Sequence, residues 1–294
     1  MANLKEVRVR ITSVNSTQQI TKAMKMVSAA KLRRAQDAIT QMRPYASKLR
    51  EILENVAGSV DTSTGSGVLA KSRPVNKVLI VAVTSNRGLA GAFNSNVIRT
   101  VNRLLIETYS AQKAKGDVKV FCIGKKASDF YSKNPQVYSG NRNEIFNNVS
   151  FAPVAMVAQE LMDDFIAGKF DEVVVVYNRF KNAAVQNVVS EKLLPIAPPD
   201  TTDKKSAAKD YIFEPSQSEI VLDLIPKAVK TQLYKAVLDS NASEHGARMT
   251  AMSKATDNAG ELIKELKLQY NKARQAAITN EILEIVAGAE ALNG

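Results

Sequence analysis

The sequence has few of the residues from which proteins build reactive centres. Among its 294 residues are one cysteine, one histidine and no tryptophan. A single cysteine excludes an internal disulfide and a thiolate metal cluster. A single histidine without evident partners argues against a histidine metal site or a Ser-His-Asp triad. The residues therefore indicate no catalytic centre, no metal site and no cofactor.

The two rare residues have simple structural interpretations. Cys122 lies among Val120, Phe121 and Ile123, where a buried, inert thiol in a strand is expected. His245 lies in a helical pattern, and we expect it on a helix surface.

Long apolar runs are also absent. No stretch approaches the roughly 20 apolar residues of a membrane span, and the N-terminus lacks the apolar core of a signal peptide. We therefore expect membrane contact only through partners. The formal net charge of +11 favours an acidic partner, which could be nucleic acid, an anionic membrane surface or an acidic protein face.

The last stretch of the chain, residues 226–286, organises the rest. Proline is absent after its first residue, and small or apolar residues recur every three or four positions: Met249, Met252, Thr256, Ala259, Ile263, Leu266, Tyr270, Ala273 and Ala277. This spacing predicts one long helix that packs along a thin seam against another helix.

The first 57 residues can supply that partner. A three-four rhythm runs through Leu32, Ala35, Ile39, Met42, Ala46, Leu49, Leu53 and Val56, whereas an offset stripe, Ile20, Met24 and Val27, precedes it. We expect the two halves of this helix to have different neighbours, and Pro44 to kink or restart it. Eleven Lys or Arg against four Asp or Glu make this segment basic.

The middle of the chain has a different texture. Residues 58–76 are rich in Gly, Ser and Thr and predict a linker. Residues 77–215 contain short β-branched runs (77–84, 118–123 and 172–177) that alternate with helical patterns. Such alternation predicts a sheet that is covered on both faces and is at least partly parallel. Further runs at 185–189 and 211–213 could add edge strands.

The predicted fold is therefore α/β, with a long antiparallel coiled coil of the two terminal helices and an inserted Rossmann-like domain. The predicted parts are an N-terminal coiled-coil helix (1–57), a linker (58–76), the α/β domain (77–215) and a C-terminal coiled-coil helix (216–294). A Gly88-Leu89-Ala90-Gly91-Ala92 loop follows the first predicted strand, but it lacks the spacing of dinucleotide or P-loop motifs. A structural turn or a protein-contact loop competes with a phosphate site there.

Several segments also resemble one known family. Residues 278–291, Ile-Thr-Asn-Glu-Ile-Leu-Glu-Ile-Val-Ala-Gly-Ala-Glu-Ala, resemble the C-terminal signature of γ subunits of F-type ATP synthases. Residues 20–27 (Ile-Thr-Lys-Ala-Met-Lys-Met-Val) resemble the N-terminal helix of that family. Residues 84–89 (Thr-Ser-Asn-Arg-Gly-Leu) resemble its first loop, and residues 255–259 (Ala-Thr-Asp-Asn-Ala) its C-terminal helix.

This resemblance implies a non-catalytic rotor in the central stalk. The coiled coil would turn inside a hexamer of α and β subunits, while the α/β domain stands with the ε subunit on the membrane c-ring. Rotation driven by proton flow would then cycle the catalytic β subunits through ATP synthesis. The same resemblance implies a location on the cytoplasmic face of a bacterial plasma membrane, an expectation that also rests on the absence of a transit peptide. The subunit would also influence the rate of ATP hydrolysis by the complex.

The resemblance also assigns partner contacts by position. Met24 and Lys25, with the loop that contains Arg87 and Gly88, match family positions near acidic lever loops of β. Polar positions that engage the catch loops of the hexamer are matched by Arg248, Arg274, Gln275, Thr279 and Glu284. No nucleic-acid contact is implied, although from the residues alone a basic coiled-coil adaptor or nucleic-acid binder remains the alternative.

Overall fold

A computed structural model describes residues 4–56, 65–196 and 217–293, and it separates them into two compact units. The first unit combines residues up to Ser28 with residues from Met249 onward, and the second comprises residues 29–248. Two long helices contribute to both units: α1 (Leu4–Val56) and α6 (Gln217–Asn293). None of the described helices has a stretch long and apolar enough to cross a bilayer.

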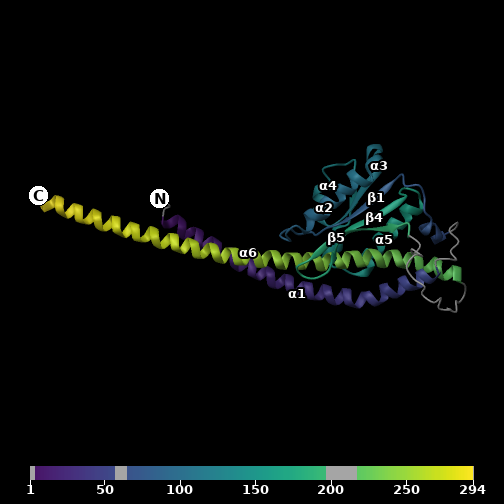
Figure 1. The fold of residues 1–294 in the computed structure, drawn as a ribbon, viewed down its shortest axis with the longest axis horizontal. Coiled ribbons are helices and arrows are strands. Elements are labelled where there is room, and N and C mark those ends of the chain that lie inside the picture. The colour runs from purple at the N-terminus through teal and green to yellow at the C-terminus, as the bar shows by residue number, and fades with distance from the viewer. Residues whose placement is uncertain (1–3, 57–64, 197–216, 294) are drawn as a thin grey trace. The chain divides into compact units, whose positions relative to one another are not determined.

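The second unit is built on a five-stranded sheet of strand order β3-β2-β1-β4-β5 (Figure 1). The strands β1 (Val78–Val83), β2 (Val118–Ile123), β3 (Tyr138–Asn141) and β4 (Glu172–Phe180) are parallel, and β5 (Gln186–Leu194) pairs with β4 as an antiparallel edge. The chain leaves β1 toward β2 on one side and reaches β4 on the other, so the order reverses at β1. This is the Rossmann-like arrangement that the alternating pattern predicted.

Alternating side chains of the strands form two apolar layers, one on each face of the sheet. Leu79, Val81 and Val83 face a core formed with α5 (Phe151–Ile166) and the first part of α6. Val78, Ile80 and Ala82 face a second core formed with α2 (Phe93–Arg103), the π-helix η3 (Leu104–Thr108) and α4 (Lys125–Tyr131). The remaining short elements are η2 (Gly65–Ala70), α3 (Ser110–Lys115) and η4 (Asn143–Asn147).

The first part of α6 thus packs against one face of the sheet. Its buried residues Val229, Leu233 and Val237 lie in the same core as the strands. The boundary between the two compact units therefore falls inside both long helices. The predicted ranges 1–57, 58–76, 77–215 and 216–294 instead keep each long helix whole. Those ranges remain a prediction about functional parts.

The predicted linker contains a core residue. Leu69, in η2, is 1% exposed and packs in the core between the sheet and α5. Its backbone carbonyl also accepts a hydrogen bond from the backbone N–H of Ile196 at 2.9 Å. Leu69 is therefore a core residue inside the range predicted as a linker. Its burial could not be predicted, because a single leucine among Gly and Ser gives no periodic apolar pattern.

In the first unit, α1 and α6 form an antiparallel helix pair. Thr256 Oγ1 lies 2.8 Å from Thr21 Oγ1, and Lys25 Nζ donates to Ser253 Oγ at 2.9 Å. Gln18 Nε2 donates to the Thr256 carbonyl at 3.3 Å. Residue numbers thus rise along one helix as they fall along the other, so the two helices are antiparallel. The predicted seam of α6 is confirmed here, since Met252, Ala259 and Leu266 are buried.

The offset stripe predicted for α1 is wrong. Ile20 and Val27 are 59% and 58% exposed, whereas the polar residues Thr21 and Ser28 are buried. The rhythm of Leu32, Ala35 and Ile39 continues backward at three-four spacing, with polar residues at some seam positions, through the buried or half-buried Ser28, Met24, Thr21, Gln18, Val14, Ile11 and Val7. The hydroxyl groups of Thr21 and Ser28 donate to main-chain carbonyls of their own helix, which makes their burial tolerable.

In the second unit, Leu32, Ala35, Ile39 and Leu49 are buried as predicted, whereas the side chains of Leu53 and Val56 lie outside those described. Neither proline ends its helix: α1 continues through Pro44 and α6 through Pro226. The sequence patterns did not predict β3 and α4, and the suggested strand at 211–213 lies outside the described residues.

Candidate partner-contact sites

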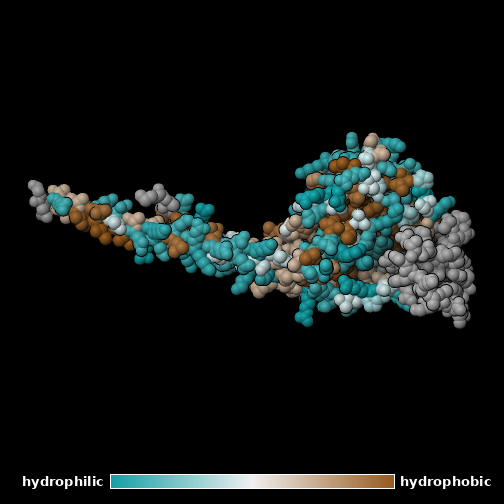
Figure 2. All heavy atoms as spheres, in the orientation of Figure 1, coloured by the Kyte–Doolittle hydropathy of each residue, from teal (hydrophilic) through white to brown (hydrophobic). Residues whose placement is uncertain are grey.

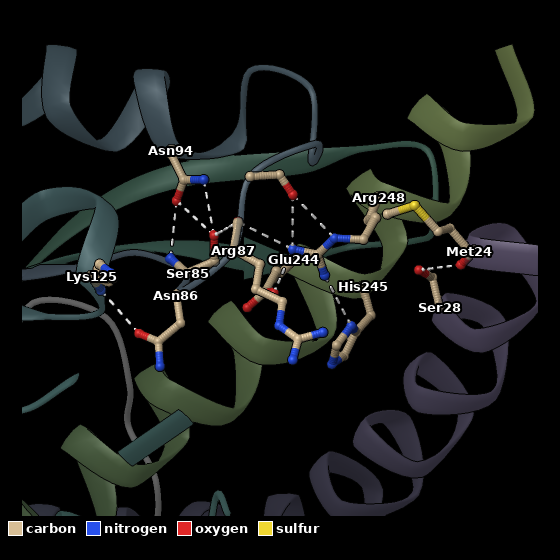
Figure 3. Close-up of polar contacts among 11 residues, drawn as sticks. Met24, Ser28, Ser85, Asn86, Arg87, Asn94, Lys125, Glu244, His245 and Arg248 are labelled. Carbon is tan, nitrogen blue, oxygen red and sulfur yellow. Dashed lines mark hydrogen bonds and ion pairs between the residues drawn. The ribbon is translucent and has the colours of Figure 1, made fainter. Parts of the chain in front are cut away.

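The loop after β1 lies at the carboxyl end of the sheet, where the strand order reverses. Asn94, in the first turn of α2, holds its base: Asn94 Oδ1 accepts from the Ser85 backbone N–H at 2.9 Å and lies 3.1 Å from Ser85 Oγ. Ser85 Oγ also donates to the Arg87 carbonyl at 2.6 Å. The side chain of Asn86 accepts a hydrogen bond from the Lys125 backbone N–H at 2.9 Å (Figure 3). It also donates to the Asn143 carbonyl at 2.8 Å.

The tip of this loop has an unusual backbone. Leu89 adopts φ 62°, in the left-handed region that disfavours residues with a Cβ, and its side chain is 64% exposed. Gly91 follows with φ 57°. The loop thus presents an exposed apolar side chain beside the exposed Arg87, while its polar base is occupied by internal hydrogen bonds. This geometry favours a protein-contact loop over a phosphate-binding one.

Arg248 of α6 reaches the same loop. Its Nε lies 3.4 Å from the Gly88 carbonyl oxygen, and its Nη2 lies 3.3 Å from the Arg87 carbonyl oxygen. Nη2 also forms an ion pair with Glu244 Oε1 at 2.7 Å, one helical turn earlier. Both side chains of the pair are only 8% exposed. Figure 3 shows the guanidinium between Glu244 and the loop.

Burial dominates the electrostatics around Arg248. It raises the pKa of Glu244 above its usual range, against the opposing effect of the Arg248 cation. It lowers the pKa of His245 to about 4, with further lowering by Arg248 and Lys31. His245 is therefore neutral near pH 7, and its Nδ1 lies 3.4 Å from Arg248 Nη1. The sequence placed His245 on a helix surface, but its ring is partly buried against Arg248.

Two other predicted contact residues lie on α1 in the first unit. Lys25 is exposed, and its ammonium group donates to Ser253 Oγ on α6. Met24 is partly buried, and its main-chain carbonyl accepts from Ser28 Oγ at 2.8 Å. The adjacent Met26 is 62% exposed, so this part of α1 presents both basic and apolar groups to solvent.

The remaining predicted residues lie near the end of α6, also in the first unit. Arg274, Gln275, Thr279 and Glu284 are all exposed, and Thr279 Oγ1 donates to the Gln275 carbonyl at 2.9 Å. By the antiparallel pairing of the two helices, α1 begins opposite residues near Arg274, so α6 continues without α1 beyond that point (Figure 1). Exposed apolar residues lie there: Ile278, Ile282, Leu283, Ile285 and Val286 (Figure 2).

Within the second unit the structure thus brings together Arg87, Gly88 and Arg248, whereas the other predicted residues belong to the first unit. Sequence reasoning missed Glu244, Ser85 and Asn94. The four-residue spacing of Glu244 and Arg248 on a helix could have indicated an ion pair, but its burial could not be read from the sequence. Among the described residues, no group of three or more His, Cys, Asp or Glu side chains is placed to hold a metal ion. Cys122 is buried as expected, and burial raises its pKa to about 12.

Comparison with known proteins gives one consistent result. The family model described as ATP synthase matches residues 3–292. Proteins called "ATP synthase gamma chain" from Flavobacterium psychrophilum and Flavobacterium johnsoniae are 60% and 59% identical over 294 residues, covering 100% of both chains. A chain of the Euglena gracilis mitochondrial ATP synthase structure has a TM-score of 0.71 at 22% identity, covering 98% of this chain and 94% of that chain, and shares the fold.

Proposed function

The chain belongs to the ATP synthase gamma chain family, in which it is a non-catalytic subunit of the central stalk, and we propose that it turns as the rotor of its complex. The end of α6 would rotate inside a hexamer of α and β subunits, so that different angles of the helix stabilise different conformations of each catalytic β subunit. In thermodynamic terms, the rotor is a ligand whose contacts change with angle.

The observation that carries this proposal is the end of α6 beyond α1. Five apolar side chains are exposed on a single helix there, which is costly unless a partner covers them. A ring of subunits with an apolar lining would cover them on all sides without a fixed register. A helix without deep pockets can turn in such a lining, because every orientation buries a similar apolar area.

Polar groups beside this apolar end would transmit force. We propose that Arg274, Gln275, Thr279 and Glu284, all exposed, engage catch loops of the hexamer, and that Met24, Lys25, Arg87 and Gly88 lie near acidic lever loops of β. The excess of basic residues in α1 would complement those acidic loops and guide their approach. Arg248 differs from the other predicted residues, because its guanidinium is buried.

The sheet domain would provide the other end of the transmission. We propose that it binds the ε subunit and the membrane c-ring, so that the chain contacts the membrane only through partners. The complex would then lie on the cytoplasmic face of a bacterial plasma membrane. The two bacterial relatives named above are consistent with this location.

ATP-driven proton pumping tests the rotor function. Complexes assembled with this chain in membrane vesicles should acidify the vesicle interior on addition of ATP, and vesicles assembled without it should not. The charge reversal Arg274→Glu should reduce pumping more than ATP hydrolysis, because it alters a proposed force-transmitting contact. Lys264→Glu is the matched control, since Lys264 is also exposed but lies where α1 accompanies α6.

Equal pumping with and without the chain would remove the rotor assignment. Equal pumping by the Arg274→Glu and Lys264→Glu complexes would leave the rotor but refute the role of Arg274.

A further inference from the structure

Each of the three guanidinium nitrogens of Arg248 has a partner inside its own chain. Nε reaches the Gly88 carbonyl, Nη1 reaches His245 Nδ1, and Nη2 reaches Glu244 and the carbonyls of Arg87 and Gly88. The side chain is only 7% exposed. A planar group with donors fixed in a fork suits this arrangement, and a lysine ammonium could not reach all of these acceptors at once.

Burying this ion pair is not explained by stability alone. Desolvation of two charges commonly offsets their attraction, so a buried pair contributes little net stability compared with apolar residues of similar size. Buried polar groups instead fix a particular arrangement of the chain in some proteins. The arrangement fixed here is the loop after β1, whose carbonyls face the guanidinium.

That loop holds a residue in an unfavourable conformation. Leu89 combines a left-handed backbone with an exposed side chain, so its own packing does not maintain φ 62°. The residues just before it, Arg87 and Gly88, are the ones whose carbonyls accept from Arg248. The conformation of the tip thus depends on contacts made immediately upstream.

We propose that the Glu244–Arg248 pair is an internal clamp that holds the loop of residues 85–91 in this conformation, so that Arg87 and Leu89 are presented to a partner protein. Glu244 orients the guanidinium, and the guanidinium fixes two consecutive carbonyls. Arg248 is then a positioning residue that acts through the loop. The resemblance to the γ subunit family instead implied a direct contact with the hexamer.

Hydrogen exchange of the full-length chain tests the clamp. Arg248→Lys keeps the charge but loses the fork. The amides of residues 85–91, among them the Ser85 N–H that donates to Asn94 Oδ1, should then exchange roughly tenfold faster, which corresponds to about 1.4 kcal/mol of local opening. Amides of β1 should be unchanged. Arg179→Lys is the matched control, because Arg179 also pairs with a glutamate, Glu191, but on the β4–β5 hairpin. It should leave the amides of residues 85–91 unaffected.

A second substitution separates positioning from simple damage. Asparagine tolerates the left-handed backbone better than leucine, so Leu89→Asn reduces the strain that the clamp opposes. The double variant Arg248→Lys/Leu89→Asn should recover most of the lost protection. If Arg248→Lys does not fold, Glu244→Gln serves instead and should speed exchange of the same amides by a smaller factor.

Unchanged exchange at residues 85–91 in Arg248→Lys and Glu244→Gln would overturn the clamp. Faster exchange that Leu89→Asn does not reduce would also overturn it, because strain at Leu89 would then not be what the pair restrains.

The link between the clamp and coupling rests on the proposed function. In the assembled complex, Arg248→Lys should lower the protons pumped per ATP, and Leu89→Asn should restore part of that loss. Lower pumping with normal loop exchange would instead indicate direct contact of Arg248 with a partner. Failure of the wild-type chain to support pumping would refute the rotor assignment and leave the exchange result intact.

Discussion

Gly124, which follows β2, allows the closest backbone approach among the described glycines. Its φ is 112°, in a region that residues with a Cβ rarely occupy. A Cβ at this position would lie 2.1 Å from the Thr84 carbonyl oxygen and 2.6 Å from its carbon. Both are backbone atoms, so no side-chain rotation can relieve the overlap.

The contacts around Gly124 connect two strands to α4. Thr84 donates its N–H to the Ile123 carbonyl at 2.8 Å, and its Oγ1 accepts from the Ala127 N–H at 2.9 Å. Gly124→Ala must move Thr84 and loosen these bonds. The backbone region costs about 1 to 3 kcal/mol and the overlap a similar amount, which gives about 4 kcal/mol of lost stability.

Thermal unfolding followed by circular dichroism measures this loss. At roughly 2 °C per kcal/mol for a chain of this size, Gly124→Ala should lower Tm by about 8 °C. Substitutions at two other glycines provide a comparison for the loss of stability. Gly116→Ala meets open space at φ 79° and should cost only about 1 kcal/mol, whereas Gly88→Ala has ordinary φ and one distant contact and should be near neutral. Equal Tm values for all three variants would refute the reasoning from close approach.

Further predictions concern buried groups. Burial raises the pKa of Asp239 to about 6, so the folded protein binds more protons at this site than the unfolded chain does. The contribution of Asp239 to stability therefore falls as pH rises from about 4 to 6. In urea titrations, Asp239→Asn should gain more stability at pH 7 than at pH 4.5. His245, with its pKa lowered to about 4, contributes stability that falls as pH drops from 6.5 toward 4, and His245→Gln should remove that slope over the same urea series. In the helix pair, Thr21→Val and Thr256→Val together should destabilise less than the sum of the single changes in a double-mutant cycle, because each single change already removes the contact between the two hydroxyl groups. Leu69→Ala should cost about 2 to 5 kcal/mol in chemical denaturation, whereas a linker residue would cost almost nothing.

The helical rhythm of both chain ends could be predicted because it is local. A three-four repeat depends only on which residues are apolar, and the seam through Met252, Ala259 and Leu266 was found in this way. The same method failed between Ile20 and Val27, because it weighted apolar residues over the polar Thr21 and Ser28 that continue the seam. Hydrogen bonds to carbonyls of the same helix made these residues acceptable inside, and hydropathy does not record such bonds.

The sequence by itself determined the class of fold, the family and the absence of an evident catalytic cluster, because these depend on residue types, their spacing and short motifs. Tertiary structure alone decided that α6 covers one face of the sheet, and that Leu69 belongs to the core. It also decided that the buried Arg248 side chain binds the carbonyls of Arg87 and Gly88, about 160 residues away in the chain. The burial of a charge depends on which distant segments surround it, and no local pattern of residues encodes those neighbours.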